Sequence, residues 1–466
     1  MSFHLPTMEI SGKEVLPLIE GGKGVGASSG RSSGAWARAG GVGTFSAVNA
    51  DRYDDNGEYI PLVYRGKSRM ARHEELIEYS IAGGISQAKI AHDIAGGNGR
   101  IHMNVLWEMA ASERVLRGVL EGARGLVHGV TCGAGMPFKL APLAAEYRVW
   151  YYPIVSSARA FRALWLRSYR KVPEWLGGVV YEDPWLAGGH NGLSNSEDPQ
   201  QPEPPYDRVA LLRRTMNEFG LQRTPIIMAG GVWCLREWVD WIDNPELGPI
   251  AFQFGTRPLL TKESPIPDRW KEKLRTLKKG DIVLNRFSPT GFYSSAVRNS
   301  FLRELEERLE HEVSYVDHPA GDLRTPFVFG VRHRTVYVTE HDAQRIAIWQ
   351  KEGFSKALTT PDSTLIFVTP QQAQAIRKDQ LDCMGCLSQC KFSNWACNER
   401  GTTGHKADPR SFCIQLTLQN IIHGGDPDRN LMFCGHSGYR FAEDPLYADG
   451  HIPTVAELIE VIRRGD

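Results

Sequence analysis

Trp185-Leu-Ala-Gly-Gly-His-Asn-Gly192 is the stretch from which the fold of this chain can be worked out. Its paired glycines let the backbone come very close to a flat or charged ligand, and its histidine can donate, accept or carry a proton near neutral pH. Alone, a Gly-Gly-His sequence is equally consistent with an ordinary turn. Two further glycine turns, Gly230-Gly231 and Gly255-Thr256, follow at the spacing that successive β/α units of a barrel would give.

Strand-like apolar runs alternate with stretches of helical spacing up to about residue 260. This alternation predicts a parallel sheet with helical crossovers, and about eight such runs favour a closed (β/α)8 TIM barrel over an open doubly wound sheet. Helices are expected between the strands, for example over residues 73–82 and 235–242. The predicted strands are 15–19, 42–46, 101–106, 126–130, 149–155, 176–181, 225–229 and 249–254.

The chain changes character after the predicted barrel, which we assign to residues 1–265. An α+β accessory region is expected over residues 266–380. A cysteine-rich region follows over residues 381–466, and we expect it to carry a metal or iron–sulfur site. Thr454-Val-Ala-Glu457 is a capping box that predicts a final helix.

The overall composition indicates a globular protein rather than a disordered one. The 466 residues include 54 basic and 54 acidic side chains, a balance that gives no support to binding nucleic acid or an anionic membrane. The N-terminus lacks the layout of a signal peptide, and we find no apolar run long enough to cross a bilayer. A cytoplasmic location is therefore expected, and the eight cysteines are more readily thiols or metal ligands than disulfides.

The glycine turns after the last two predicted strands indicate a phosphate site. In a β/α barrel the site lies at the carboxyl ends of the strands, and phosphate commonly sits in the loops after strands seven and eight. Gly230, Gly231, Gly255 and Thr256 occupy those places and would expose backbone N–H groups. Tight turns without a ligand are the alternative. The pair of turns, one β/α unit after Gly-Gly-His, favours a phosphate monoester such as that of FMN.

An ordered set of motifs between about Val15 and Ser264 carries a family resemblance. The motifs are Glu20-Gly-Gly-Lys-Gly-Val-Gly26, Ala39-Gly-Gly-Val-Gly-Thr44, Met103-Asn104, Gly133-Ala-Gly-Met-Pro137, Ala187-Gly-Gly-His-Asn-Gly192, Met228-Ala-Gly-Gly-Val232, Phe254-Gly-Thr-Arg-Pro258 and Lys262-Glu-Ser264. With these motifs the chain resembles the nitronate monooxygenase (2-nitropropane dioxygenase-like) family of FMN-dependent TIM barrels. That family also includes flavin enoyl reductases of fatty-acid synthesis.

The resemblance implies a set of cofactor contacts in this chain. Gly22 and Lys23 would lie against the flavin, and Asn104 would hydrogen-bond its isoalloxazine or ribityl chain. Gly189 would pack near the cofactor. The four residues of the two glycine turns would hold the FMN phosphate.

The resemblance also implies His190 as the base, or as the polar group that faces the substrate. A structural histidine bonded to a loop carbonyl is the alternative. The family usually has Gln where this chain has Glu20, and Met where it has Lys23. The Lys23 ammonium would stabilise an anionic reduced flavin or pair with Glu20.

A second constellation, Cys383-Met-Gly-Cys386-Leu-Ser-Gln-Cys390, is followed by Cys397. Closely spaced thiolates in a reducing compartment indicate a metal or cluster. The C-x2-C-x3-C spacing resembles the iron–sulfur motif of flavin-dependent dienoyl reductases. We take Cys397 as the fourth ligand, with Cys413 and Cys434 as alternatives, and favour a [4Fe–4S] cluster over structural zinc.

The function expected from these features is that of an FMN-dependent oxidoreductase acting on a small molecule. Nitronate monooxygenase-like oxidation with His190 as base comes first. A flavin enoyl reductase that uses NAD(P)H, or an iron–sulfur flavoprotein that passes electrons to a redox partner, is the alternative within the enzymes. A different class remains open as well, namely a zinc-stabilised binding module on a barrel scaffold.

Overall fold

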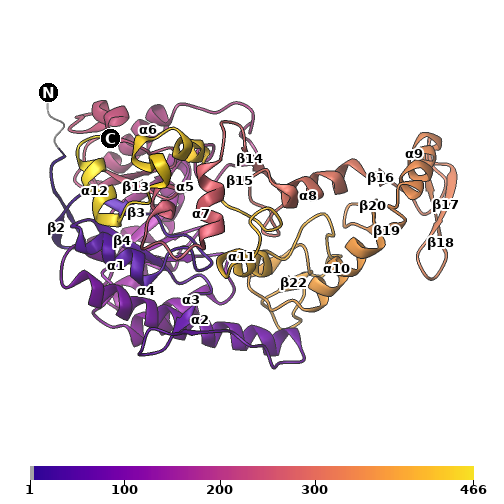
Figure 1. Ribbon diagram of the computed structural model, residues 1–466, viewed down its shortest axis with the longest axis horizontal. Helices are drawn as coiled ribbons and strands as arrows, with labels where there is room; N and C mark the ends of the chain where they lie inside the picture. Colours follow the sequence, from indigo (N-terminus) through magenta and orange to yellow (C-terminus); the bar gives the residue numbers. More distant parts are fainter. Residues whose placement is uncertain (1–4) are drawn as a thin grey trace.

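Eight parallel strands close into a barrel in the computed structural model, which describes residues 5–466 (Figure 1). Neighbouring strands follow chain order around the barrel, and the last strand pairs with the first. Each strand overlaps one of the predicted runs, so the TIM-barrel prediction is confirmed. The barrel strands are β3 (Leu18–Glu20), β4 (Val42–Ser46), β7 (Arg100–Leu106), β8 (Gly129–Gly133), β9 (Trp150–Val155), β10 (Val179–Glu182), β12 (Ile226–Ala229) and β13 (Ile250–Phe254).

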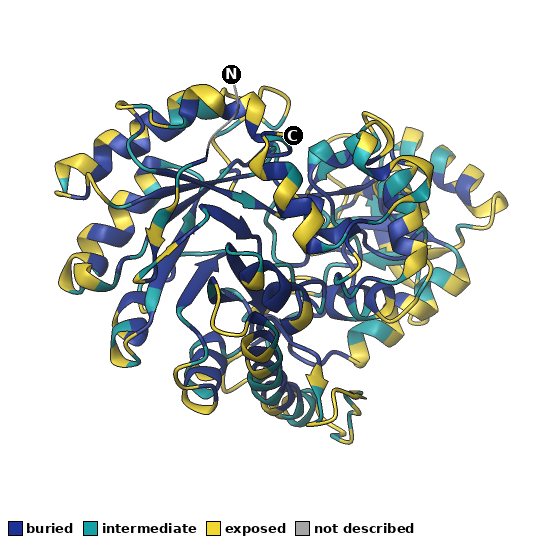
Figure 2. Ribbon diagram, turned by 60° about the vertical axis from the view of Figure 1, so that its left-hand side comes forward, coloured by how far each residue is buried: buried dark blue, intermediate teal, exposed yellow. Residues whose placement is uncertain are grey.

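A ring of helices covers the outside of the barrel. Figure 2 shows the strands buried inside and the helices exposed on their outer faces. The α-helices of this ring are α1 (Gly30–Arg38), α2 (Arg69–Ala95), α3 (Ser112–Gly122), α4 (Leu140–Glu146), α5 (Ala158–Arg167) and α6 (Pro205–Glu218). Short 3-10 turns supplement them: η1 (Tyr169–Lys171), η2 (Pro173–Trp175), η3 (Leu235–Trp241) and η4 (Arg257–Leu260). The α-helix expected over 235–242 is therefore replaced by η3, which is kinked at Trp238.

Helix α2 runs well beyond the predicted stretch 73–82 because two glycines in its middle do not end it. A Cβ on Gly83 would stand 2.1 Å from the carbonyl oxygen of Ala50, and one on Gly84 would stand 2.5 Å from Val119. The glycines thus allow α2 to pack closely on its neighbours. Packing across this helix outweighs the cost of glycine in a helix interior, which is about 1 kcal/mol per residue.

The last helix, α12 (Val455–Arg463), returns to the barrel. Its capping box is present as predicted, with Thr454 and Glu457 bonding each other's backbone N–H groups. Its apolar side chains join the main barrel core. The division at 265 and 380 remains a prediction, but this helix packs with the first part of the chain rather than with the cysteine-rich segment before it.

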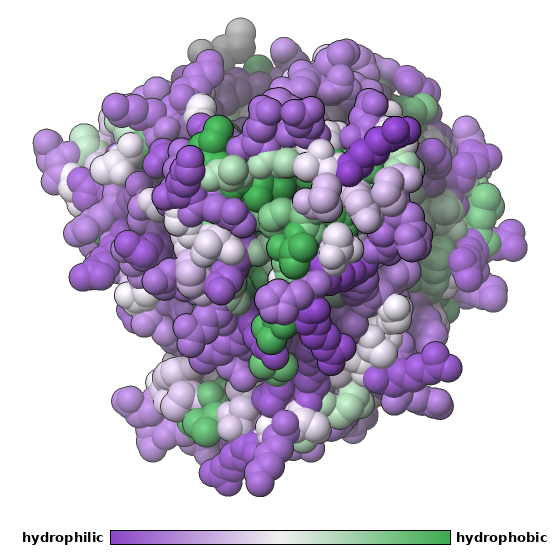
Figure 3. Space-filling view, turned by 90° about the vertical axis from the view of Figure 1, so that its right-hand side faces the viewer, coloured by the Kyte–Doolittle hydropathy of each residue, from purple (hydrophilic) through white to green (hydrophobic). Residues whose placement is uncertain are grey.

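A small lobe projects from the barrel at the end of α8 (Figure 1). It has a separate core that includes Val336, Trp349 and Phe367. The face at this end of the molecule is mostly hydrophilic, with a few separate hydrophobic patches (Figure 3). The connecting and lobe elements are α7 (Asp268–Arg275), β14 (Ile282–Asn285), β15 (Ser294–Val297), α8 (Ser300–Glu310), β16 (Glu312–Ser314), β17 (Thr325–Phe329), β18 (Arg334–Val338), α9 (Glu340–Lys351), β19 (Lys356–Thr359) and β20 (Thr364–Val368).

The cysteine-rich segment lies between the lobe and the barrel and shares a core with both. Val25 and Leu76 of the barrel pack in the same cluster as Cys386 and Trp395. Helix α10 (Pro370–Leu381) leads into this segment, which contains β21 (Gln389–Cys390), β22 (Trp395–Ala396), α11 (Ile414–Ile422), η5 (His436–Ala442) and η6 (Pro445–Gly450). Short strand pairs near the N-terminus complete the fold: β1 (Met8–Ile10) with β2 (Lys13–Val15), and β5 (Arg52–Tyr53) with β6 (Tyr59–Ile60). No helix within residues 5–466 combines the length and the apolar character needed to span a bilayer.

Candidate functional site

A cavity of ≈ 480 Å³ lies at the carboxyl ends of the barrel strands. One wall comes from the loops that follow the strands, and the other comes from the region after the barrel. Every cofactor and catalytic residue predicted from the sequence lines this cavity: Gly22, Lys23, Asn104, Gly189, His190, Gly230, Gly231, Gly255 and Thr256. The fold therefore brings together, in one place, residues that are spread over more than 230 positions of the chain.

The two glycine turns present unused backbone donors to the cavity. Gly230 and Gly231 both have positive φ angles, +91° and +77°, a conformation that glycine adopts without strain. Backbone N–H groups that are free in a turn favour an anion. Within residues 5–466, no hydrogen bond is formed by the N–H groups of Gly230, Gly231, Gly255 or Thr256. These four donors suit a phosphate group.

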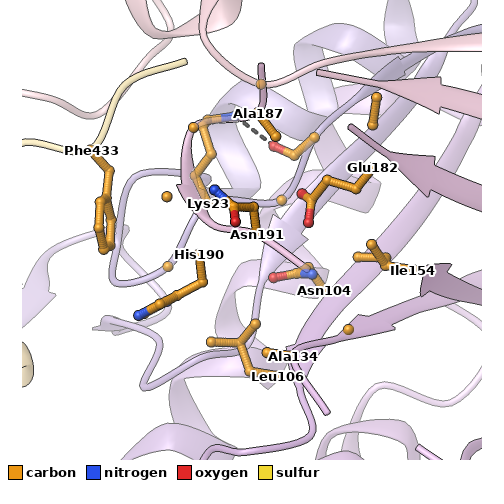
Figure 4. A pocket seen from close by; sticks show the side chains of 18 of the residues that line it. Lys23, Asn104, Leu106, Ala134, Ile154, Glu182, Ala187, His190, Asn191 and Phe433 are labelled. Carbon is orange, nitrogen blue, oxygen red and sulfur yellow. Dashed lines mark hydrogen bonds between the residues drawn. The ribbon is translucent and has the colours of Figure 1, made fainter. Parts of the chain in front are cut away.

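Gly22 and Asn104 lie against each other at the floor of the cavity. A Cβ on Gly22 would stand 2.2 Å from Asn104 Cβ, so only glycine fits there. The Asn104 amide makes only long contacts, 3.5 Å to Ser46 Oγ and 3.5 Å to Thr131 Oγ1. Bonds of this length are weak, so the amide can still bond strongly to a ligand. Asn104 and His190 enter the cavity from different elements (Figure 4).

Lys23 pairs with Glu20, one of the two arrangements expected for it. Lys23 Nζ lies 3.4 Å from Glu20 Oε1 and donates a shorter bond, 2.7 Å, to the Gly21 carbonyl. Burial lowers the pKa of Lys23, and burial raises the pKa of Glu20, although each partner opposes the shift of the other. Lys23 also lines the cavity, so its side chain lies beside any ligand that binds there.

His190 is held by a strand pair between the two walls of the cavity. Gly189 and His190 form β11, which pairs antiparallel with β15 of the region after the barrel. His190 Nε2 lies 2.6 Å from Ser288 Oγ, which in turn lies 2.8 Å from Thr290 Oγ1. Burial lowers the pKa of His190 to about 4. The imidazole is therefore neutral at pH 7 and able to accept a proton.

Two polar side chains of the cavity were not predicted from the sequence. Glu182 stands at the end of β10, and burial, reinforced by Asp183, raises its pKa to about 8. Asn191 follows His190, and its amide Nδ2 is buried without a hydrogen-bond partner in the described residues. Both point into the cavity in Figure 4. The position of Glu182 at a predicted strand end was a signal that could have identified it.

The segment from Phe433 to Ser437 forms much of the far wall and was also missed. Its Gly435 N–H donates a 2.9 Å bond to Thr256 Oγ1, across 179 positions of the chain. The Phe433 ring lies edge-on to His190, with ring centroids 5.4 Å apart. The Cys-Gly-His-Ser sequence at 434–437 resembles the glycine turns of the barrel, but no periodic pattern links it to them.

The cysteines predicted to bind metal separate into two environments. Cys383, Cys386 and Cys390 are buried, whereas Cys397 is exposed and has its Sγ 3.6 Å from His73 Nε2. Throughout residues 5–466, no group of three or more His, Cys, Asp or Glu side chains is arranged to hold a metal ion. The structure thus does not show the metal site expected at these four cysteines.

The cavity fits FMN on its own geometry. Four unused N–H groups at one end match a phosphate, and apolar walls with a few polar groups match a flat ring system. Orphaned Asn191 Nδ2 and the weakly bonded Asn104 amide supply hydrogen-bonding groups that lack a strong partner in the described chain.

Comparisons with solved structures give the same fold. FabK from Thermotoga maritima is 16% identical over 96% of this chain and 91% of that chain, with a TM-score of 0.50. The enoyl reductase domain of MlnA from Bacillus amyloliquefaciens is 12% identical over 97% of this chain and 94% of that chain, with a TM-score of 0.53. At these identities the likeness establishes the fold alone. A search of curated proteins gave no match.

The family is established by sequence. The family model described as "Nitronate monooxygenase" matches residues 127–462. This range includes His190, both glycine turns and the far wall of the cavity. Because it covers well over half of the chain, the chain belongs to the nitronate monooxygenase family and is an FMN-dependent TIM-barrel oxidoreductase.

Proposed function

We propose that this oxidoreductase acts on a small nitronate-like substrate, with His190 as the base. The observation that carries the proposal is a neutral, oriented imidazole inside the cavity that suits FMN. When bound, FMN supplies the capacity to accept or give a hydride or single electrons. The residues of the chain bind and orient the cofactor and substrate, and move the proton.

The proposed cofactor contacts follow the cavity from end to end. Gly230, Gly231, Gly255 and Thr256 hold the phosphate through their unused N–H groups. The other cofactor-binding residues lie against the flavin: Gly22, Lys23, Asn104 and Gly189. The Lys23 ammonium favours negative charge on the part of the flavin that it faces.

The atom that we propose as the base is Nδ1 of His190. When Nε2–H donates to Ser288 Oγ, Nδ1 carries the lone pair and accepts the proton. Ser288 then donates to Thr290 Oγ1, which fixes the orientation of the ring. The Phe433 ring packs against the imidazole and keeps water away from that side.

A second candidate is reduction of an activated alkene with NAD(P)H as the hydride donor. Two observations favour it: the cavity is mostly walled by apolar groups, and the fold of an enoyl reductase domain aligns over nearly the whole chain. In this case His190 would give a proton to the substrate rather than take one.

Oxygen uptake with alkyl nitronates, compared with NAD(P)H oxidation in the presence of enoyl thioesters, separates the two candidates. We expect nitronate turnover, and we expect His190→Asn to lower it by about 10²–10⁴-fold while FMN content is unchanged. Asn can still bond to Ser288 but cannot accept a proton. Wild-type activity should also fall as the pH drops towards about 4, where His190 becomes protonated. Full activity of the Asn variant would exclude His190 as the base.

A further inference from the structure

Four thiols gather beside the cavity, and they are not the four that the spacing suggested. Cys383, Cys386 and Cys390 are buried in one core cluster, and Cys413 packs against that cluster just before α11. All four are free thiols. Cys386 also lines the main cavity, so this group of thiols and the FMN site share a side chain.

The surroundings of the four thiols are mostly apolar. Leu387, Phe392 and Trp395 are buried in the same core cluster. Bringing four ionisable thiols together in an apolar core is unfavourable for thiolates unless a cationic centre compensates their charges.

Two hydrogen-bond donors are directed at one of these sulfur atoms. Ser393 Oγ lies 3.1 Å from Cys383 Sγ, and the Gly385 N–H donates to the same sulfur at 3.4 Å. Such N–H and O–H donors stabilise cluster-bound thiolates and tune their electronic properties.

The Tyr64 hydroxyl is an independent indication that a group bound beside the thiols is absent from the chain itself. This hydroxyl is buried without a hydrogen-bond partner in the described part of the chain. Tyr64 packs against the same core cluster as Cys383, Cys386 and Cys390. A buried hydroxyl beside this cluster is thus left without a hydrogen-bond partner.

The arrangement suits a cluster better than a single ion. Zinc binds thiolates at about 2.3 Å, so its four sulfur atoms must lie within about 4 Å of one another. In residues 5–466 no three suitable side chains are arranged around one ion in this way. In a [4Fe–4S] cluster each cysteine binds a different iron atom, so the four sulfur atoms stand further apart.

We propose that Cys383, Cys386, Cys390 and Cys413 bind a [4Fe–4S] cluster at the wall of the FMN cavity. Cys413, and not the exposed Cys397, is the fourth ligand. Cys397 lies in the same loop but is turned to His73. The site goes beyond the proposed reaction, because it adds a second centre that neither the family nor the proposed substrate requires.

The experiment compares two single-thiol variants of the whole protein, Cys413→Ser and Cys397→Ser. Each is purified without air and reconstituted with ferrous iron and sulfide. Iron, zinc and acid-labile sulfide are measured per chain, and FMN content and thermal unfolding are recorded on the same samples. We expect about four iron atoms and four sulfides in the wild type and in Cys397→Ser. Cys413→Ser should lose most of both and keep its FMN and fold.

Three results would overturn the proposal. They are a wild type that holds no iron and sulfide after reconstitution, zinc in their place, and iron lost from Cys397→Ser but kept by Cys413→Ser. If Cys413→Ser does not fold, Cys383→Ser and Cys390→Ser provide the same comparison with Cys397→Ser. Because FMN is measured separately, absence of flavin would contradict the proposed function without affecting the iron and sulfide result.

Discussion

The barrel and the region that covers its open end contribute to the same cavity in different ways. In the barrel, the cavity residues lie at or just after the carboxyl ends of the strands, so Gly230 and Gly255 come together because β12 and β13 are neighbours. In the covering region, Phe433 and Gly435 reach the cavity through contacts with His190 and Thr256 that span 179 positions or more of the chain. The barrel thus supplies the residues that we propose as cofactor contacts, and the covering region bonds to His190 and closes the far side.

The largest effect should come from placing a charge on the barrel side. Gly255→Asp puts a carboxylate among the four unused N–H groups, and a Cβ there meets no atom within 4 Å. A carboxylate about 4 Å from a phosphate repels it by roughly 4 kcal/mol at an effective dielectric constant of ~20. We therefore expect FMN affinity to fall at least ~100-fold in a fluorescence titration of the apoprotein.

Gly255→Ala is the matched control, because its methyl group fits the same open space without charge. It should bind FMN almost as well as the wild type. Equal affinity of the Asp and Ala variants would place the phosphate elsewhere.

A smaller effect is expected where the two regions are joined. Arg257 is 1% exposed and donates to the Trp233 carbonyl, to Asp444 and to the carbonyl of Asp466. Arg257→Gln leaves these acceptors without their cation, so the free energy of unfolding should fall by about 3 kcal/mol. Urea denaturation measures this loss.

Arg236→Gln provides the comparison on the surface. Arg236 pairs with Asp466 as well, but its side chain is 62% exposed. Loss of the Arg236 side chain should lower the free energy of unfolding by less than about 1 kcal/mol. If the two variants are equally stable, the buried junction does not hold the regions together.

The smallest effect expected is a change in how the free energy of unfolding depends on pH when Glu182 is replaced. Glu182 has its pKa raised from 4.5 to about 8, so the folded protein keeps a proton that the unfolded chain releases. This contribution to stability is present at low pH and is lost as the pH rises towards about 8. The free energy of unfolding of the Glu182→Gln apoprotein should equal that of the wild type at pH 5 and exceed it by about 2 kcal/mol at pH 9. This figure is smaller than the pKa shift alone would give, because solvent in the cavity weakens the effect of burial.

Unfolding at a series of pH values tests the role of Glu182, with the exposed Glu174→Gln as control. The control should follow the wild-type profile. A Glu182→Gln profile identical to that of the wild type would mean that Glu182 is ionised in the folded protein.

The strands of the barrel could be predicted because the sequence patterns that indicate them are local. Some apolar runs of strand length, such as 225–229 and 249–254, ended at glycine turns, and those turns marked positions at the carboxyl end of the barrel. The boundaries were less well predicted. The run 126–130 predicted a strand that begins only at Gly129, and Gly83 and Gly84 hid the length of α2 because glycine usually weakens a helix.

The far wall of the cavity could not be predicted, for a physical reason. Phe433 and Cys413 are placed by packing between distant segments, and neither periodicity nor short motifs report such contacts. Cysteine spacing correctly marked a loop rich in thiols. It could not distinguish Cys397 from Cys413, because only the fold determines which of them turns inward.

The most direct test of the account compares FMN with riboflavin as ligands of the apoprotein. The two differ only in the phosphate, which we place on the N–H groups of Gly230, Gly231, Gly255 and Thr256. Fluorescence titration should show that FMN binds at least ~100-fold more tightly, since several charge-assisted hydrogen bonds of 1.5–3 kcal/mol each are lost with riboflavin. Equal affinity for the two ligands would contradict the placement of the cofactor and, with it, the proposed function.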